Sequence, residues 1–144
     1  MRMSLAELLK KRLVERIEAD ERLSKELFEN AKKDLRAAED NLKMDHADWA
    51  LAIAYNAMLS AGRAMMAKKG YRALSDAHHL AVVQFCAAVL PKESSALASV
   101  FNRYRVRRHD VVYGEADSVG SDEAKRAVDN ARKFVESIER TIGK

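Results

Sequence analysis

Residues 48–70 read DWALAIAYNAMLSAGRAMMAKKG, and this stretch indicates how the chain folds. From Trp49 to Met66, apolar side chains point in almost every direction around a helix, which is typical of a helix that neighbours cover on most sides. Asp45 or Asp48 can cap its start, and its many alanines let those neighbours approach closely. Two lysines favour a helix C-terminus, and Gly70 can adopt the left-handed conformation that ends a helix. The stretch therefore predicts the central helix of a bundle.

The rest of the chain supplies the neighbours of this helix. Core helices are predicted for 21–44, for 77–90, from Ser94 or Ser95 through the segment 101–114, and from Ser121, which can cap the last one. The connections between them are short, so neighbouring helices should be antiparallel. No alternation of period two lasts long enough to make a sheet. The sequence predicts an all-α fold, an antiparallel bundle of four to five helices.

The first 20 residues carry a separate apolar stripe. Ser4 can cap a helix in which Leu5, Leu8, Leu9, Leu13 and Ile17 recur at helical spacing. This stripe does not join smoothly to the stripe of the next helix. We therefore expect residues 1–20 to form an amphipathic helical arm and residues 21–144 to form the bundle domain. One continuous helix is the alternative.

Composition excludes several classes of protein. The chain has 144 residues, which suits one domain, and its net charge of +4 permits an acidic partner without requiring one. Cys86 is the single cysteine, so neither a disulfide framework nor a multi-cysteine metal site is expected, and its apolar surroundings favour an inert buried thiol. No apolar run approaches the roughly 18 to 20 residues that span a bilayer. We expect a cytoplasmic protein with no membrane partner, metal or cofactor.

Residues 101–114 read FNRYRVRRHDVVYG and contain four arginines and a histidine within seven positions, Arg103 to His109. A projection at about 100° per residue places Arg108 in the middle of an apolar stripe. That stripe comprises Leu97, Phe101, Tyr104 and Val111. Arg103 points away from the stripe, whereas Arg105 and His109 flank it on one side and Arg107 on the other.

An inward guanidinium such as that of Arg108 is costly unless it is paired. In one interpretation a carboxylate from another helix neutralises it. In the other, this face is only half covered and lines a cleft in which phosphate oxygens supply the acceptors. The sequence leaves both open.

Other polar residues add few alternatives. His78 and His79 point about 100° apart and cannot readily share a metal in one helix, so we expect one of them to hydrogen-bond to the central helix, through Tyr55 or Asn56. Arg63 is a candidate second inward charge. Glycine-rich phosphate loops, paired carboxylates and Ser/His/Asp groupings are missing. Any chemistry must come from arginine, histidine and tyrosine, which suit phosphodiester chemistry without a metal.

Five segments, taken in order, resemble the HEPN superfamily over about residues 21–142. They are AKKDLRAAEDNL, AIAYNAMLSAGRAMMAKKGY, DAHHLAVVQF, RRHDVVYG and SDEAKRAVDNARKFVESI. The resemblance implies an antiparallel helical bundle that is often dimeric. Many members are metal-independent endoribonucleases, and many form a toxin–antitoxin pair with a minimal nucleotidyltransferase. Others are binding modules without catalysis.

The family's nuclease motif is an arginine, usually followed by a polar residue, with a histidine a few positions later. Placed by the downstream Tyr-Gly, the motif falls on Arg108 and His109, and Tyr113 stands where its histidine would be. A tyrosine is a poor proton shuttle near neutral pH. A looser alignment pairs Arg103 with His109. In some family pairs the nucleotidyltransferase modifies a tyrosine close to the motif, and Tyr113 is the candidate here.

The resemblance therefore favours a homodimeric binding module for RNA or a nucleotide, paired with a minimal nucleotidyltransferase antitoxin. Its phosphate-binding residues would be Arg105, Arg107, Arg108 and Tyr113. The alternative is an endoribonuclease toxin, in which Arg108 or Arg103 holds the phosphate and His109 moves the proton. A structural helical adaptor with solvated or paired arginines is the third hypothesis.

Overall fold

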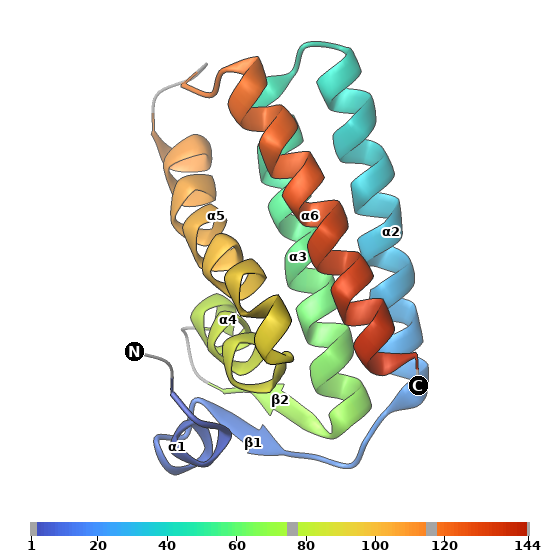
Figure 1. The fold of residues 1–144 in the computed structure, drawn as a ribbon, viewed down its shortest axis with the longest axis vertical. Coiled ribbons are helices and arrows are strands. Elements are labelled where there is room, and N and C mark those ends of the chain that lie inside the picture. Colours follow the sequence, from blue (N-terminus) through green and yellow to red (C-terminus); the bar gives the residue numbers. More distant parts are fainter. Residues whose placement is uncertain (1–2, 75–77, 115–117, 144) are drawn as a thin grey trace.

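A computed structural model of the chain describes residues 3–74, 78–114 and 118–143 (Figure 1). Its helices are α1 (Leu5–Lys10), α2 (Glu21–Lys43), α3 (Ala47–Lys69), α4 (His78–Val89), the short 3-10 helix η1 (Lys92–Ser94), α5 (Ser95–Tyr113) and α6 (Ser121–Ile142). Two three-residue strands, β1 (Val14–Arg16) and β2 (Tyr71–Ala73), complete the described elements. The prediction of an all-α helical bundle is confirmed, although the two strands add a small sheet at one end.

Helix α3 lies at the centre of the bundle, as its sequence predicts. In Figure 1 α6 crosses in front of it, α2 runs beside it, and α5 lies on the other side. Most of its side chains are buried. A narrow stripe along its length is half buried or exposed and comprises Trp49, Ile53, Asn56, Ser60 and Arg63. Because these residues recur every three or four positions, they mark one face of α3 that its neighbours do not fully cover.

The end of α3 follows the sequence prediction, but two helix starts do not. Gly70 adopts the left-handed conformation, with φ 84°, and a Cβ there would lie 2.8 Å from the carbonyl oxygen of Ile17. The residue that caps α3 is His46, without a side-chain hydrogen bond, rather than either nearby aspartate. At α6, Gly120 occupies the cap position and Ser121 is the first helical residue.

The N-terminal segment differs from the predicted helical arm. Ser4 and Glu7 form the capping box of α1, which confirms the predicted cap. The helix nevertheless ends at Lys10, and Arg12 takes a positive φ of 59°. The chain then forms β1, which pairs antiparallel with β2. The prediction that the chain forms no sheet is therefore wrong, because two distant three-residue segments meet without a repeating local pattern.

The core is built from aromatic contacts and close helix approaches. The ring of Phe101 lies 5.7 Å from that of Tyr55 and 4.9 Å from that of Phe134, which joins α3, α5 and α6. Cys86 is fully buried, and burial raises the pKa of its thiol, as expected for an inert cysteine. Among the described residues, no helix combines the length and apolar character needed to cross a membrane.

Candidate anion-binding site

Helix α5 is well covered in its first half and much less in its second. Ala98 and Phe101 are its buried residues. Val106 and Val112 are exposed, and Tyr113 at the helix end is 72% exposed. The predicted apolar stripe continues to Val111, which like Tyr104 is partly buried and packs against the core, whereas the sides of this half of α5 are open to solvent. Arg105, Arg108 and His109 lie in this second half.

Arg108 is half buried, and none of the residues that the structure describes neutralises its charge. Its Nε atom is buried and has no hydrogen-bond partner among the described residues. It also forms no ion pair with a carboxylate of the described residues. A buried N–H without an acceptor carries a desolvation cost of about 1–3 kcal/mol, or more for a charged group. Of the two interpretations that the sequence left open, the geometry favours the half-covered face over the internal ion pair.

Four basic residues line one cavity of about 230 Å³ beside this guanidinium. Arg105, Arg108 and His109 come from α5, and His79 comes from the start of α4. We call this cavity the basic pocket. Arg63 of α3 lines a different cavity, together with His78 and Tyr71, but its charge also acts on His79. Arg105 donates from Nε to the side-chain oxygen of Asn102 at 3.1 Å, which leaves its terminal nitrogens for other acceptors. Asp110 also lines the cavity, but its side chain is exposed.

His79, which lines the basic pocket, pairs with a buried tyrosine of α3. The hydroxyl of Tyr55 lies 3.1 Å from Nδ1 of His79, and Tyr55 is almost fully buried. Burial raises the pKa of Tyr55 to about 12, against the opposing effect of Arg105, Arg108 and Arg63. The phenol therefore stays protonated at neutral pH.

His79 is held in its neutral form by the same surroundings. Burial lowers the pKa of His79, and the positive charges of Arg63, Arg108 and Arg105 lower it further. These three guanidiniums act on one imidazole although they come from two different helices. The basic pocket thus concentrates positive charge that the described residues do not balance.

The sequence predicts the contact between α3 and α4 and the inward position of Arg63, but it does not connect either with the basic pocket. The expected hydrogen bond between a histidine of α4 and the central helix is confirmed, between His79 and Tyr55. Arg63 was expected to face inward, and it is half buried. Neither residue was assigned to the site. Arg63 lies on the uncovered stripe of α3. That stripe depends on which helices pack against α3, so the sequence alone does not reveal it.

Arg107 points to the opposite side of α5, toward α6. Its Nε and one terminal nitrogen donate to the two carboxylate oxygens of Glu123 at 2.8 and 3.0 Å. The same terminal nitrogen donates to the carbonyl oxygen of Ser118 at 2.9 Å. The Glu123 carboxylate raises the pKa of Arg107, and the guanidinium lowers the pKa of Glu123. Arg107 is therefore paired with Glu123 within the protein and is not part of the basic pocket.

Arg103 and Tyr113 also lie outside the basic pocket. Arg103 is exposed and lines a different hollow, together with Gln84 and Asn102. Arg103 and His109, which the looser alignment pairs, therefore line different cavities. Tyr113 is exposed, and its ring lies 5.0 Å from that of His109. It extends the basic pocket along the surface as an aromatic neighbour.

Comparisons with known proteins agree with this fold. A family model described as HEPN domain matches residues 24–141. The crystal structure of TT1696 from Thermus thermophilus is similar, with a TM-score of 0.64 and 20% identity over 81% of this chain and 96% of that chain. A comparison with curated proteins found no match. The match to the family model spans most of the chain, which therefore belongs to the HEPN domain family.

Proposed function

We propose that this protein binds the phosphate groups of RNA or of a nucleotide in the basic pocket. The observation that carries the proposal is the half-buried guanidinium of Arg108, which lines the basic pocket and forms no ion pair with a carboxylate of the described residues. Guanidinium groups pair with phosphate oxygens through several N–H donors at once. Arg105 and Arg63 add charge, and a neutral His79 adds a donor or an acceptor according to its tautomer.

The position of Tyr113 favours binding over cleavage. It stands where the family resemblance places the histidine of the nuclease motif, and it lies exposed at the end of α5. A metal-independent endoribonuclease is the second candidate, supported by the shared cavity of Arg108 and His109. Purified protein that cleaves RNA in EDTA, with activity lost in His109→Ala, would establish that second function.

The expected partners follow from the family rather than from the geometry. We propose a homodimer that acts in the cytoplasm beside a minimal nucleotidyltransferase, as in a toxin–antitoxin pair. The exposed hydroxyl of Tyr113 offers such an enzyme an acceptor. Light scattering tests the dimer. Incubation with a minimal nucleotidyltransferase and nucleoside triphosphate, followed by intact-mass measurement of the native protein and of Tyr113→Phe, tests the pairing.

The phosphate site is tested by comparing two arginines of the same helix. Fluorescence anisotropy with a labelled single-stranded RNA should show about tenfold weaker binding for Arg108→Ala, since a hydrogen bond to a charged group is worth about 1.5–3 kcal/mol. The slope of log affinity against log salt should fall by about 1. Arg103→Ala, on the other side of α5, is the matched control and should bind nearly as the native chain does. Equal losses in both variants would reject a localised site.

A further inference from the structure

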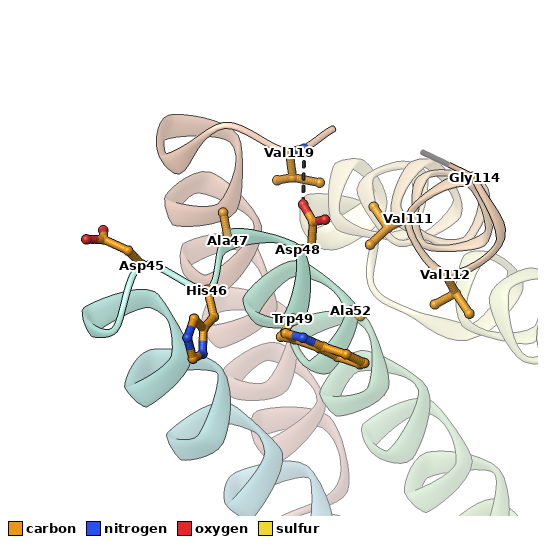
Figure 2. A pocket seen from close by; sticks show the side chains of 10 residues that line it. All are labelled: Asp45, His46, Ala47, Asp48, Trp49, Ala52, Val111, Val112, Gly114 and Val119. Carbon is orange, nitrogen blue, oxygen red and sulfur yellow. Dashed lines mark hydrogen bonds between the residues drawn. The ribbon is translucent and has the colours of Figure 1, made fainter. Parts of the chain in front are cut away.

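Trp49 is a large aromatic side chain that the fold leaves in solvent. It lies in the first turn of α3, is 65% exposed, and is the single tryptophan of the chain. Figure 2 shows its indole extending from α3 toward the side of α5 that carries Val112. Both residues line a cavity of about 500 Å³. We call this cavity the indole pocket. Tryptophans that are exposed in this way serve recognition more often than folding, because burying one is strongly favourable.

The indole pocket and the basic pocket share no lining residue, but both are lined by residues of the second half of α5. Val112 follows Arg108 by four residues, so the two side chains share a face of α5 and lie about 6 Å apart along the helix axis. On α3, Trp49 begins the uncovered stripe that ends at Arg63.

We propose that Trp49 stacks on an unpaired base of single-stranded RNA while a neighbouring phosphate of that strand lies in the basic pocket. The inference rests on the proposed function and specifies its ligand as a single strand. Stacking requires an accessible base face, and every base offers one, so this contact selects unpaired RNA without selecting a sequence. Val112 supplies an apolar part of the lining of the indole pocket.

The surroundings of Trp49 fit a nucleotide better than a second copy of the chain. Asp45, His46 and Asp48 line the same pocket, so its lining includes charged and polar groups. The centres of protein–protein interfaces are depleted in charged residues. A base edge, by contrast, carries hydrogen-bonding groups that polar neighbours tolerate, while the base face meets the indole.

The single tryptophan makes the proposal directly measurable. Oligouridine and an abasic ribose–phosphate oligomer of the same length carry the same phosphates, but only the first has bases. We expect oligouridine to quench the fluorescence of Trp49 with saturation, and the abasic oligomer to leave it nearly unchanged. Trp49→Ala should bind oligouridine about tenfold more weakly, as expected for the loss of one stacked base, and should bind the abasic oligomer as before.

Three further variants complete the experiment. Trp49→Phe should recover part of the lost affinity, because a smaller ring still stacks. Leu23→Ala removes an exposed apolar side chain from α2 and should change neither affinity. Arg108→Ala should weaken the binding of both oligomers.

The results separate the inference from the function on which it rests. If Arg108→Ala weakens binding but Trp49→Ala does not, the indole pocket is not a base subsite and the phosphate site stands. If fluorescence changes with protein concentration, and Trp49→Ala alters the oligomeric state by sedimentation, a second copy covers the indole and the inference is overturned. If the native chain binds neither oligomer, both proposals fail.

Discussion

Arg107 and Arg108 are adjacent in the chain, yet the fold treats them in opposite ways. Their side chains point about 100° apart on α5. Arg107 forms a bidentate ion pair, in which Nε and one terminal nitrogen donate to the two carboxylate oxygens of Glu123. Arg108 lines the cavity between α5 and the start of α4, where the described residues supply no acceptor for its Nε. Arg107 therefore stabilises the native fold, whereas Arg108 forms no ion pair among the described residues and is the centre of the proposed phosphate site.

The ion pair of Arg107 predicts a pH-dependent effect of Glu123→Gln. We expect the variant to lose about 1 kcal/mol of unfolding free energy at pH 7, since the pair is bidentate but partly exposed. The pKa of Glu123 is lowered in the native state, so its stabilisation is present above the ordinary glutamate value of about 4.3 and is lost as the pH falls through the native pKa. Urea denaturation at a series of pH values measures the difference.

A matched control for this variant is Glu26→Gln, which breaks the exposed pair with Arg22. Its effect at pH 7 should be clearly smaller, because solvent screens that pair. Equal effects of the two variants, or a Glu123→Gln difference that does not shrink at acid pH, would contradict the role assigned to Arg107.

His79 gives a second prediction at this scale. Its imidazole should titrate below the ordinary histidine value of about 6.5, because burial and three guanidiniums disfavour the charged form. Added inorganic phosphate should raise that pKa, since an anion in the basic pocket favours the imidazolium. NMR titration of the imidazole measures both values. The phosphate effect should be much smaller in Arg108→Ala, and a phosphate effect of equal size there would place the anion elsewhere.

At the scale of elements, the bundle depends on how closely α4 approaches α3. A Cβ at Gly62 would lie 2.7 Å from a methyl carbon of Val82 and 3.1 Å from the sulfur of Cys86. Both neighbours are fully buried, and valine has little rotamer freedom in a helix. Because Gly62 has no side chain, α4 can lie close to α3, and this close approach allows His79 to contact Tyr55.

Gly62→Ala should accordingly destabilise the protein. Alanine is favoured over glycine within a helix by about 1 kcal/mol, but overpacking a core costs about 1–3 kcal/mol. We expect a net loss of unfolding free energy, measured by thermal denaturation, together with a changed His79 signal. Ser60→Ala on the half-buried stripe of the same helix is the control and should be neutral or slightly stabilising. A more stable Gly62→Ala would show that α4 moves away at little cost.

Periodicity explains which elements the sequence predicts well. The helix predicted over 21–44 appears as Glu21–Lys43 because its stripe faces one continuous core. The strands were missed because β1 and β2 are short and lie far apart in the chain. The same division holds for the site. The inward turn of Arg108 follows from spacing on one helix, whereas the convergence of Arg63 and His79 depends on tertiary packing.

At the scale of the whole molecule, the N-terminal segment is tied to the bundle although it precedes the family match. Leu8 and Val14 are fully buried, and β1 pairs with the strand between α3 and α4. The amide of Ile17 donates to the carbonyl oxygen of Gly70, and that of Asp20 donates to Ala67, both at 2.9 Å. Figure 1 shows this segment at the end of the bundle away from the start of α3. These contacts favour one cooperative unit over a separable arm.

Leu8→Ala tests that cooperativity across the length of the molecule. Truncating a fully buried leucine should cost about 2–5 kcal/mol of unfolding free energy. Trp49 reports from the far end of α3, and far-UV circular dichroism reports on all the helices. If the chain is one unit, both signals should shift together to lower urea concentration in the variant. Leu5→Ala, which truncates a half-buried side chain in the same helix, should shift them less. An early loss of helical signal in Leu8→Ala with an unchanged Trp49 transition would instead show that residues 1–20 unfold as an independent arm.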